Sequence, residues 1–355
     1  MNYFYSPPWT LQNGLVMTLH TALKMSQNWE KHIAVPEPIY QPQIFVGAGE
    51  VPIFGKVAIP ENPKGTIVAT YGITGDLDNQ WFLKILGRKA FAQGYAIVLF
   101  DWRAHGKTAE LSPTLTSDGL YEGEDFVRIA AKAKAMGCPA PFWFTGYSLG
   151  GQLALWAIKA AQTVGTWGAD LGLAESEIGG GAAICPSLES QRSLSYLDKS
   201  AIGRSLDQAI TKQLRILAAR ISDCHPGAID PEALARVRNI WTFDEELVIR
   251  KLGFSTVEDY YRASSPLYHL DVFSKPTLII YAADDPMFDP AIVPDLETAC
   301  AQNPAIDLAL TEQGGHVGYL SSKACQRQAK DPDLWWAWNR VLEWFEQRSS
   351  LSQNR

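Results

Sequence analysis

The pattern of apolar and polar positions along the chain predicts its architecture. From about residue 43 onward, short apolar runs alternate with segments whose apolar residues recur at three- and four-residue spacing. This alternation is typical of an α/β fold in which a mostly parallel central sheet carries helices on both faces. We expect an antiparallel pair of strands at Gln43–Val46 and Val51–Ile59, followed by buried strands at Gly65–Thr70, Tyr95–Phe100, Pro141–Thr145, Gly181–Cys185, Thr277–Tyr281 and Ile306–Leu310.

Between residues 187 and 270 the alternation stops, and helical patterns alone separate two of these strands. A segment of this length is an inserted helical cap rather than a loop. We therefore expect an N-terminal extension (1–42) packed on the core, an α/β core (43–186 and 271–355) and a cap or lid (187–270) over the carboxyl edge of the sheet. The apolar residues of this segment that are available to line a channel beneath it are Leu206, Ile210, Leu214, Ile216, Leu217, Ile221, Leu247, Ile249 and Leu252.

Composition narrows the function classes. The 355-residue chain is 46% hydrophobic and carries a formal charge of -7 without a basic run, so we expect no nucleic-acid partner. Five scattered cysteines without a Cys-x-x-Cys pair favour reduced thiols over a disulfide framework or a metal site. No export signal or membrane-spanning stretch is recognised, so we expect a cytoplasmic protein. The cap and the aromatic residues of segment 3–9 would nevertheless allow weak contact with a membrane surface.

The strongest local signal is a Gly-x-Ser-x-Gly motif, Gly146-Tyr147-Ser148-Leu149-Gly150. It follows an apolar strand and precedes a helical pattern, which is the context that gives the motif its meaning. Small residues on both sides allow strand and helix to approach around a strained turn. The start of the helix directs N–H groups toward the Ser148 oxygen, where negative charge would develop. The motif predicts Ser148 as a nucleophile.

A carboxylate and a histidine follow in the chain order that this fold uses. Asp284, Asp285 and Asp289 come directly after a predicted strand, and His316 follows the next one within a glycine-rich loop. We expect His316 to be the general base. We expect Asp285 to be the acid, because an Asp-Pro pair just past a strand end suits that role, with its neighbour Asp284 as the alternative.

The loop after the strand at 65–70 supplies the remaining groups that acyl chemistry requires. An oxyanion hole needs a second N–H besides that of Leu149, and the Ile73 N–H is the natural donor because adjacent glycines let the loop turn toward Ser148.

His105 lies in another loop near the predicted site. We interpret it as a histidine that hydrogen-bonds backbone rather than as a catalytic group.

Linked motifs extend over nearly the whole chain: PPWTLQNGLVMT at 7–18, GFSTVEDYY at 253–261, SSP at 264–266, KPTLII followed by DDP within 275–286, and GGHVG at 314–318. Together they resemble the YheT-like subfamily of α/β-hydrolases, which has lipid-hydrolysing members. The resemblance implies esterase or lipase-type activity without a cofactor.

Two positions depart from the pattern of that subfamily. Tyr71 stands where a histidine is usual, and Ala104 stands where a glycine is usual. The first change leaves a backbone oxyanion donor intact, but we expect it to alter the wall of the pocket and with it the substrate preference.

These features predict a serine hydrolase that cleaves carboxylic esters, such as acylglycerols or phospholipids, through an acyl-enzyme. Thioester hydrolysis or acyl transfer on the same triad is the nearest alternative, since any nucleophile that reaches an acyl-enzyme can resolve it. A non-catalytic binding protein on a hydrolase scaffold is the alternative from another class.

Overall fold

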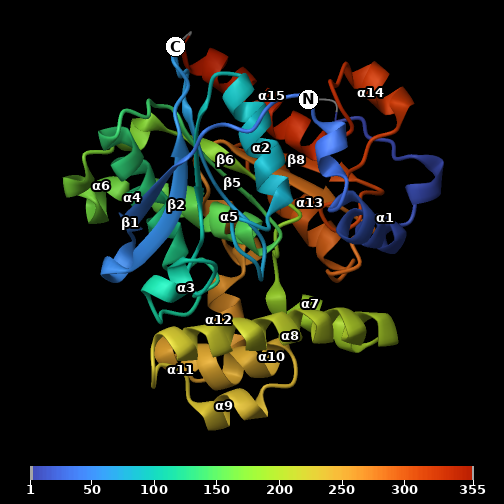
Figure 1. The fold of residues 1–355 in the computed structure, drawn as a ribbon. Helices are drawn as coiled ribbons and strands as arrows, with labels where there is room; N and C mark the ends of the chain where they lie inside the picture. The colour runs from blue at the N-terminus through green and yellow to red at the C-terminus, as the bar shows by residue number, and fades with distance from the viewer. Residues whose placement is uncertain (1–2, 354–355) are drawn as a thin grey trace.

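A computed structural model describes residues 3–353 of the protein (Figure 1). Met1, Asn2, Asn354 and Arg355 lie outside the described residues, although the predicted segments 1–42 and 271–355 include them. Eight strands form one sheet in the order β1-β2-β4-β3-β5-β6-β7-β8. The strands are β1 (Gln41–Val46), β2 (Pro52–Ala58), β3 (Thr66–Thr70), β4 (Ala96–Phe100), β5 (Phe142–Tyr147), β6 (Ile178–Ile184), β7 (Thr277–Ala282) and β8 (Ile306–Thr311).

The sheet confirms the predicted fold class. β2 pairs antiparallel with both β1 and β4, and all other pairings are parallel. Every residue of β3, β4, β5 and β7 is buried, which is why these strands appear in the sequence as continuous apolar runs. β6 begins at Ile178 rather than at Gly181, because its glycine-rich first half carries little apolar signal.

Helices cover both faces of the sheet, as predicted. α2 and α15 pack together on one face, and α4 and α5 pack together on the other (Figure 1). Aromatic side chains of α15 face the sheet. The ring of Phe345 stacks on Trp143 of β5, with 4.8 Å between the ring centroids. The helices of the sheet layers and of the two ends of the chain are α1 (Gly14–His20), α2 (Trp81–Ala92), α3 (Thr108–Leu111), α4 (Glu122–Ala135), α5 (Leu149–Ala161), α6 (Val164–Trp167), α13 (Ile292–Gln302), α14 (Lys323–Ala329) and α15 (Trp336–Gln353).

The segment between the neighbouring strands β6 and β7 is helical and lies at one end of the sheet (Figure 1). It has its own buried cluster, which includes Ile221, Val248 and Tyr260 and continues into Leu115 of the core. Its helices are therefore packed onto the core rather than tethered loosely. They are α7 (Ser190–Asp198), α8 (Ala201–Cys224), α9 (Pro231–Arg236), α10 (Ile240–Phe243), α11 (Ile249–Leu252) and α12 (Val257–Ser264).

The N-terminal aromatic residues divide between the core and the surface. Tyr5 packs against Tyr319 and Trp336, with ring centroids 5.6 and 5.0 Å away. Trp9, in contrast, is 84% exposed. Among the described residues no helix has the length and apolar character needed to cross a membrane.

Candidate active site

Ser148 occupies the sharp turn between β5 and α5. Its backbone adopts φ 55° and ψ -130°, a conformation that is strained for a residue with a side chain. The glycines around it are required by close approach, because a Cβ on Gly146 would lie 2.2 Å from the Gly150 carbonyl oxygen and one on Gly150 would lie 2.3 Å from that of Tyr71. The side chain of Ser148 does not cap α5. The turn therefore presents the hydroxyl to the space above the sheet.

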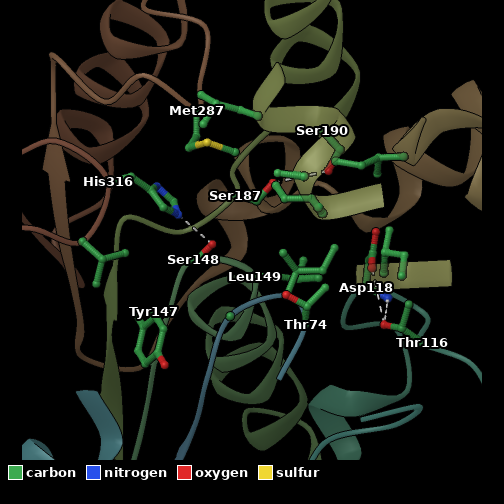
Figure 2. Close-up of a pocket in the computed structure, with 18 of the residues that line it drawn as sticks. Thr74, Thr116, Asp118, Tyr147, Ser148, Leu149, Ser187, Ser190, Met287 and His316 are labelled. Carbon is green, nitrogen blue, oxygen red and sulfur yellow. Dashed lines mark hydrogen bonds between the residues drawn. The ribbon is translucent and has the colours of Figure 1, made fainter. Parts of the chain in front are cut away.

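His316 and Asp285 complete a chain of hydrogen bonds that starts at Ser148. The Ser148 hydroxyl lies 2.9 Å from His316 Nε2, an interaction drawn as a dashed line in Figure 2. On the other side of the ring, His316 Nδ1 lies 2.8 Å from Asp285 Oδ2. A proton on Nδ1 satisfies both contacts, since Nε2 then accepts from the serine. Asp285 is buried, and its second oxygen accepts the Met287 N–H at 2.8 Å.

The other two carboxylates after β7 point elsewhere. Asp284 Oδ1 accepts the N–H of Gly315 at 2.9 Å, and burial raises the pKa of this carboxyl. Asp289 accepts the N–H of Ala291 at 2.9 Å. Of these three acids, only Asp285 hydrogen-bonds the imidazole in the described part of the chain. Asp284 instead fixes the backbone of the loop that carries His316.

The loop after β3 lies directly against the serine. A Cβ on Gly72 would lie 2.8 Å from the Ser148 Cβ, so only glycine allows this approach. Ile73 and Leu149 both line the cavity around Ser148. Leu149 is the first residue of α5, where N–H groups have no partner within the helix. Among residues 3–353 no protein acceptor engages the Ile73 N–H. The two predicted donors are thus adjacent to Ser148.

His105 supports this loop from behind. Its Nε2 accepts the Thr74 N–H at 3.0 Å, its Nδ1 lies 2.9 Å from the Arg103 carbonyl oxygen, and its ring stacks on Trp102 at 3.6 Å. Burial lowers the pKa of His105 to about 3. The imidazole is therefore neutral near pH 7, with its proton on Nδ1 and an acceptor on Nε2. The interpretation of His105 as a histidine bonded to backbone is confirmed.

Tyr71 does not form part of the pocket wall, so the expectation from the sequence is wrong at this residue. Its side chain is fully buried, and its hydroxyl donates to Asp101 Oδ1 at 2.6 Å. Asp101 also accepts the N–H groups of Leu77 and Lys107 at 2.9 Å each, and burial raises its pKa to about 6. Tyr71 thus holds the loops together below the site. The other departure, Ala104, adopts φ 65°, where a glycine would be unstrained.

A cavity of about 500 Å³ contains Ser148 and His316 and extends under the helices between β6 and β7. Of the apolar residues that the sequence made available, Leu206, Ile210, Leu214 and Leu217 line it. The others do not line it. Ile221, Leu247 and Ile249 lie within the buried cluster of this helical segment, Leu252 packs against that cluster, and Ile216 is 54% exposed. Leu214 belongs to the same cluster and also reaches the cavity. The cavity wall also includes Asp118 and Asp244, which the sequence did not single out. They lie far apart in the chain and belong to no motif.

One group of potential metal ligands occurs in the described residues, and it overlaps the site. Atoms of Cys185, Asp285 and His316 lie within 4.8 Å of one another. However, burial raises the pKa of the Cys185 thiol well above its ordinary value, and metals bind the thiolate. The thiol instead lies 3.5 Å from the Val317 N–H, in the loop that carries the histidine. The donor chemistry therefore fits a hydrogen-bonded loop better than a metal site.

Comparisons with known proteins agree on the family. Residues 76–327 match the Alpha/beta hydrolase family. The chain is 52% identical to the "Putative esterase slr0264" of Synechocystis sp., over 97% of this chain and 95% of that protein. It is 28% identical to the "Putative esterase YheT" of Escherichia coli, over 82% and 81%, respectively. It is also 26% identical to the "Phospholipase ABHD3" of Mus musculus, over 74% of this chain and 60% of that protein.

Proposed function

Because the chain belongs to the Alpha/beta hydrolase family and has YheT-like relatives, we propose that it is a serine esterase in which Ser148, His316 and Asp285 form a catalytic triad. The observation that carries the proposal is the continuous chain of hydrogen bonds from the Ser148 hydroxyl through the imidazole to the buried carboxylate. A serine that merely capped α5 would not need a histidine on its hydroxyl. Nor would it need a strained backbone.

In this mechanism His316 Nε2 takes the proton as the Ser148 oxygen attacks the acyl carbonyl of the substrate. Asp285 keeps the Nδ1 proton in place and stabilises the imidazolium that forms. The imidazolium then protonates the leaving alcohol, and the acyl group remains on the serine. A water molecule that gives its proton to the same nitrogen cleaves this acyl-enzyme and restores the free hydroxyl.

The negative oxygen of the tetrahedral intermediate requires donors that are in place before the reaction. We assign this role to the N–H groups of Ile73 and Leu149. Their support is the position of both residues in the wall around Ser148, together with the close contact of Gly72 with the serine. His105 and Tyr71 are positioning residues in this assignment, since each holds the loop through hydrogen bonds and neither is proposed to touch the reacting atoms.

The walls of the cavity support an acyl ester as the substrate class. Most of them are apolar, with Ile210, Leu214 and Leu217 from the helical segment and Phe288 beside His316. Such a surface binds a hydrocarbon chain better than a sugar or a peptide. One relative is named a phospholipase, which is consistent with a lipid ester. In this proposal, residues 187–270 act as a cap that covers the site and shapes the acyl channel.

Hydrolysis of p-nitrophenyl esters by the purified protein and by variants at Ser148 and His316 tests the proposal. Ser148→Ala and His316→Ala are each expected to lower kcat by about 10⁴-fold or more, and the double variant to be hardly slower, because triad members act as a unit. Circular dichroism and thermal melting provide the folding control. Folded single variants that keep a tenth of the wild-type rate would refute the triad.

A further inference from the structure

The cavity wall contains two carboxylates for which the proposed mechanism has no role. Asp118 comes from the loop before α4, and Asp244 comes from the turn of helix that follows α10. Asp118 is 7% exposed and Asp244 is 6% exposed, yet both line the same cavity as Ser148. In Figure 2, Asp118 lies on the side of the pocket away from His316, with Ser148 between them. The acids are therefore inside the substrate cavity but apart from the triad.

Neither carboxylate has a cationic partner among the described residues. Asp118 accepts a hydrogen bond from the Thr116 hydroxyl at 3.4 Å, and Asp244 accepts one from the Tyr261 hydroxyl. Asp125, which is fully buried, pairs with Arg103 at 2.7 Å. Asp101 and Glu122 are buried without a cation, but each accepts at least three hydrogen bonds. A buried charge without such a partner is costly. The cavity thus has two carboxyl groups at one end whose charge no cation of the described residues compensates when they ionise.

The charge of Asp118 also acts on Asp244. Burial, and after it the nearby Glu122 carboxylate, raise the pKa of Asp118 to about 7. Burial, and after it the charge of Asp118, raise the pKa of Asp244 well above its ordinary value. The Glu122 carboxylate itself accepts hydrogen bonds from the hydroxyl and N–H groups of Ser117 and from the N–H of Gly119. A cation bound between Asp118 and Asp244 would lower both pKa values and relieve this repulsion.

Aromatic rings surround the acids. Tyr261 and Phe243 line the cavity beside Asp244, and Trp241 packs edge to face on Tyr261 at 5.4 Å. Tyr260 is fully buried behind this wall. A hydrogen bond with Tyr260 is among the causes that lower the pKa of Asp118, and after burial the charges of Asp118 and Asp244 raise the pKa of Tyr260. Its hydroxyl therefore supports the acids from outside the cavity.

We propose that Asp118 and Asp244, with the rings of Phe243 and Tyr261, form an ammonium subsite, which binds a positively charged amine group of the ester substrate. Carboxylates combined with aromatic faces suit an ammonium ion, which the ring quadrupoles attract along with the formal charges. A divalent metal ion would instead require about six oxygen ligands, more than Asp118, Asp244 and the Tyr261 hydroxyl supply together. The inference rests on the proposed esterase function and specifies which esters the site selects.

Matched esters that differ only in charge provide the test. The first pair is 2-(trimethylammonio)ethyl butanoate and 3,3-dimethylbutyl butanoate, in which carbon replaces the quaternary nitrogen. A second set of methyl esters places the same two groups at the far end of acyl chains of graded length. For each pair the ratio of kcat/KM is divided by the ratio of the hydroxide-catalysed rates. We expect the wild-type protein to prefer the ammonium member of at least one pair by about tenfold.

Asp118→Asn and Asp244→Asn should each bring that ratio close to unity. Asparagine preserves the shape of the side chain and tolerates the positive φ of Asp118 (50°), so Asp118→Asn carries the test if the other variant fails to fold. Asp223→Asn removes the same charge from the exposed surface of α8 and should keep the wild-type ratio. Both esters of a pair are measured on the same preparation. An unfolded fraction therefore lowers both rates equally and leaves their ratio unchanged.

The outcomes distinguish failure of the ammonium subsite from failure of the proposed esterase function. A wild-type ratio near unity for every pair, or a preference that survives both Asn variants, would overturn the ammonium subsite while leaving the esterase proposal intact. Failure of the wild-type protein to hydrolyse any of the esters, charged or neutral, would overturn the proposed function itself.

Discussion

His105 Nε2 accepts the N–H of Thr74 at 3.0 Å, and Thr74 directly follows Ile73, one of the two assigned oxyanion donors. The imidazole is fixed in turn by the Arg103 carbonyl and by the stacked ring of Trp102. A histidine that takes no part in proton transfer thus determines where the loop beside Ser148 lies. Such support matters because an oxyanion donor is effective only if it is correctly placed before the charge develops.

His105→Phe should therefore damage catalysis more than substrate binding. Phenylalanine can keep the stack on Trp102 but offers the Thr74 N–H no acceptor. We expect kcat to fall by about ten- to a hundredfold with a smaller change in KM. His105→Gln, which can supply an acceptor, should recover part of the loss. Steady-state kinetics on a p-nitrophenyl ester decide the matter, with His32→Phe as a matched control at an exposed histidine outside the cavity wall. Equal losses in the Phe and Gln variants would show that the hydrogen bond is not the cause.

The same residue should make stability depend on pH. Burial lowers the pKa of His105 to about 3, below the ordinary value of 6.5. As the pH falls below about 6.5, the unfolded chain binds a proton at this histidine that the folded protein does not. The free energy of unfolding should therefore fall by up to about 1.4 kcal/mol per pH unit from this group, with the full contribution retained above that pH.

Urea unfolding of the wild-type protein and of His105→Gln between about pH 7 and 4.5 measures this contribution. The difference between the two free energies isolates residue 105 from the other groups that titrate in this range. The wild-type protein should lose stability more steeply than the variant as the pH falls. Parallel curves would mean that the buried imidazole becomes protonated without opening the fold.

The sheet and the turn that carries Ser148 could be predicted from the sequence because their signals are local. A strand buried on both faces is a short apolar run, and the turn at Ser148 needs its glycines within two positions. The helical segment was harder, since the three- and four-residue spacing of Ile210, Leu214, Leu217 and Ile221 shows an apolar face but not what it contacts. In the structure Leu214 and Ile221 belong to the same buried cluster, but only Leu214 of the two also lines the cavity.

Contacts between distant segments left no signal in the sequence. Tyr71 was expected on the pocket wall, but its hydroxyl bonds to Asp101 on the neighbouring strand's loop. Asp118 and Asp244 line one cavity only because the helical segment folds onto the core. Neither belongs to a motif, and a single acidic residue in a chain with 38 of them carries no information by itself.

The choice between the adjacent acids can be tested by substitution. Asp285→Asn should lower kcat by about 10⁴-fold, because asparagine at this position favours the wrong tautomer of His316. Asp284→Asn should cost far less, since its amide oxygen can still accept the Gly315 N–H. Both variants should remain folded by thermal melting. A larger loss of kcat in Asp284→Asn would mean that the neighbouring carboxylate is the true acid.

The helical segment should select acyl-chain length through the residues that line the cavity. Ile210→Trp places a larger side chain in the wall and should lower kcat/KM for long acyl esters relative to short ones. Ile216→Trp makes the same change on the same helix at a residue that is 54% exposed, and it should keep the wild-type ratio. Rates on p-nitrophenyl esters of graded chain length give both ratios. An unchanged preference in the folded Ile210 variant would remove the segment from substrate selection.

The most direct test of the account is to find the nucleophile chemically. The purified protein is treated with a fluorophosphonate probe, and the modified peptide is located by mass spectrometry. The triad predicts a single adduct on Ser148, no adduct in Ser148→Ala and strongly slowed labelling in His316→Ala, because the serine oxygen then lacks its base. Labelling of another residue, or unchanged labelling in Ser148→Ala, would contradict the central claim that Ser148 is the catalytic nucleophile.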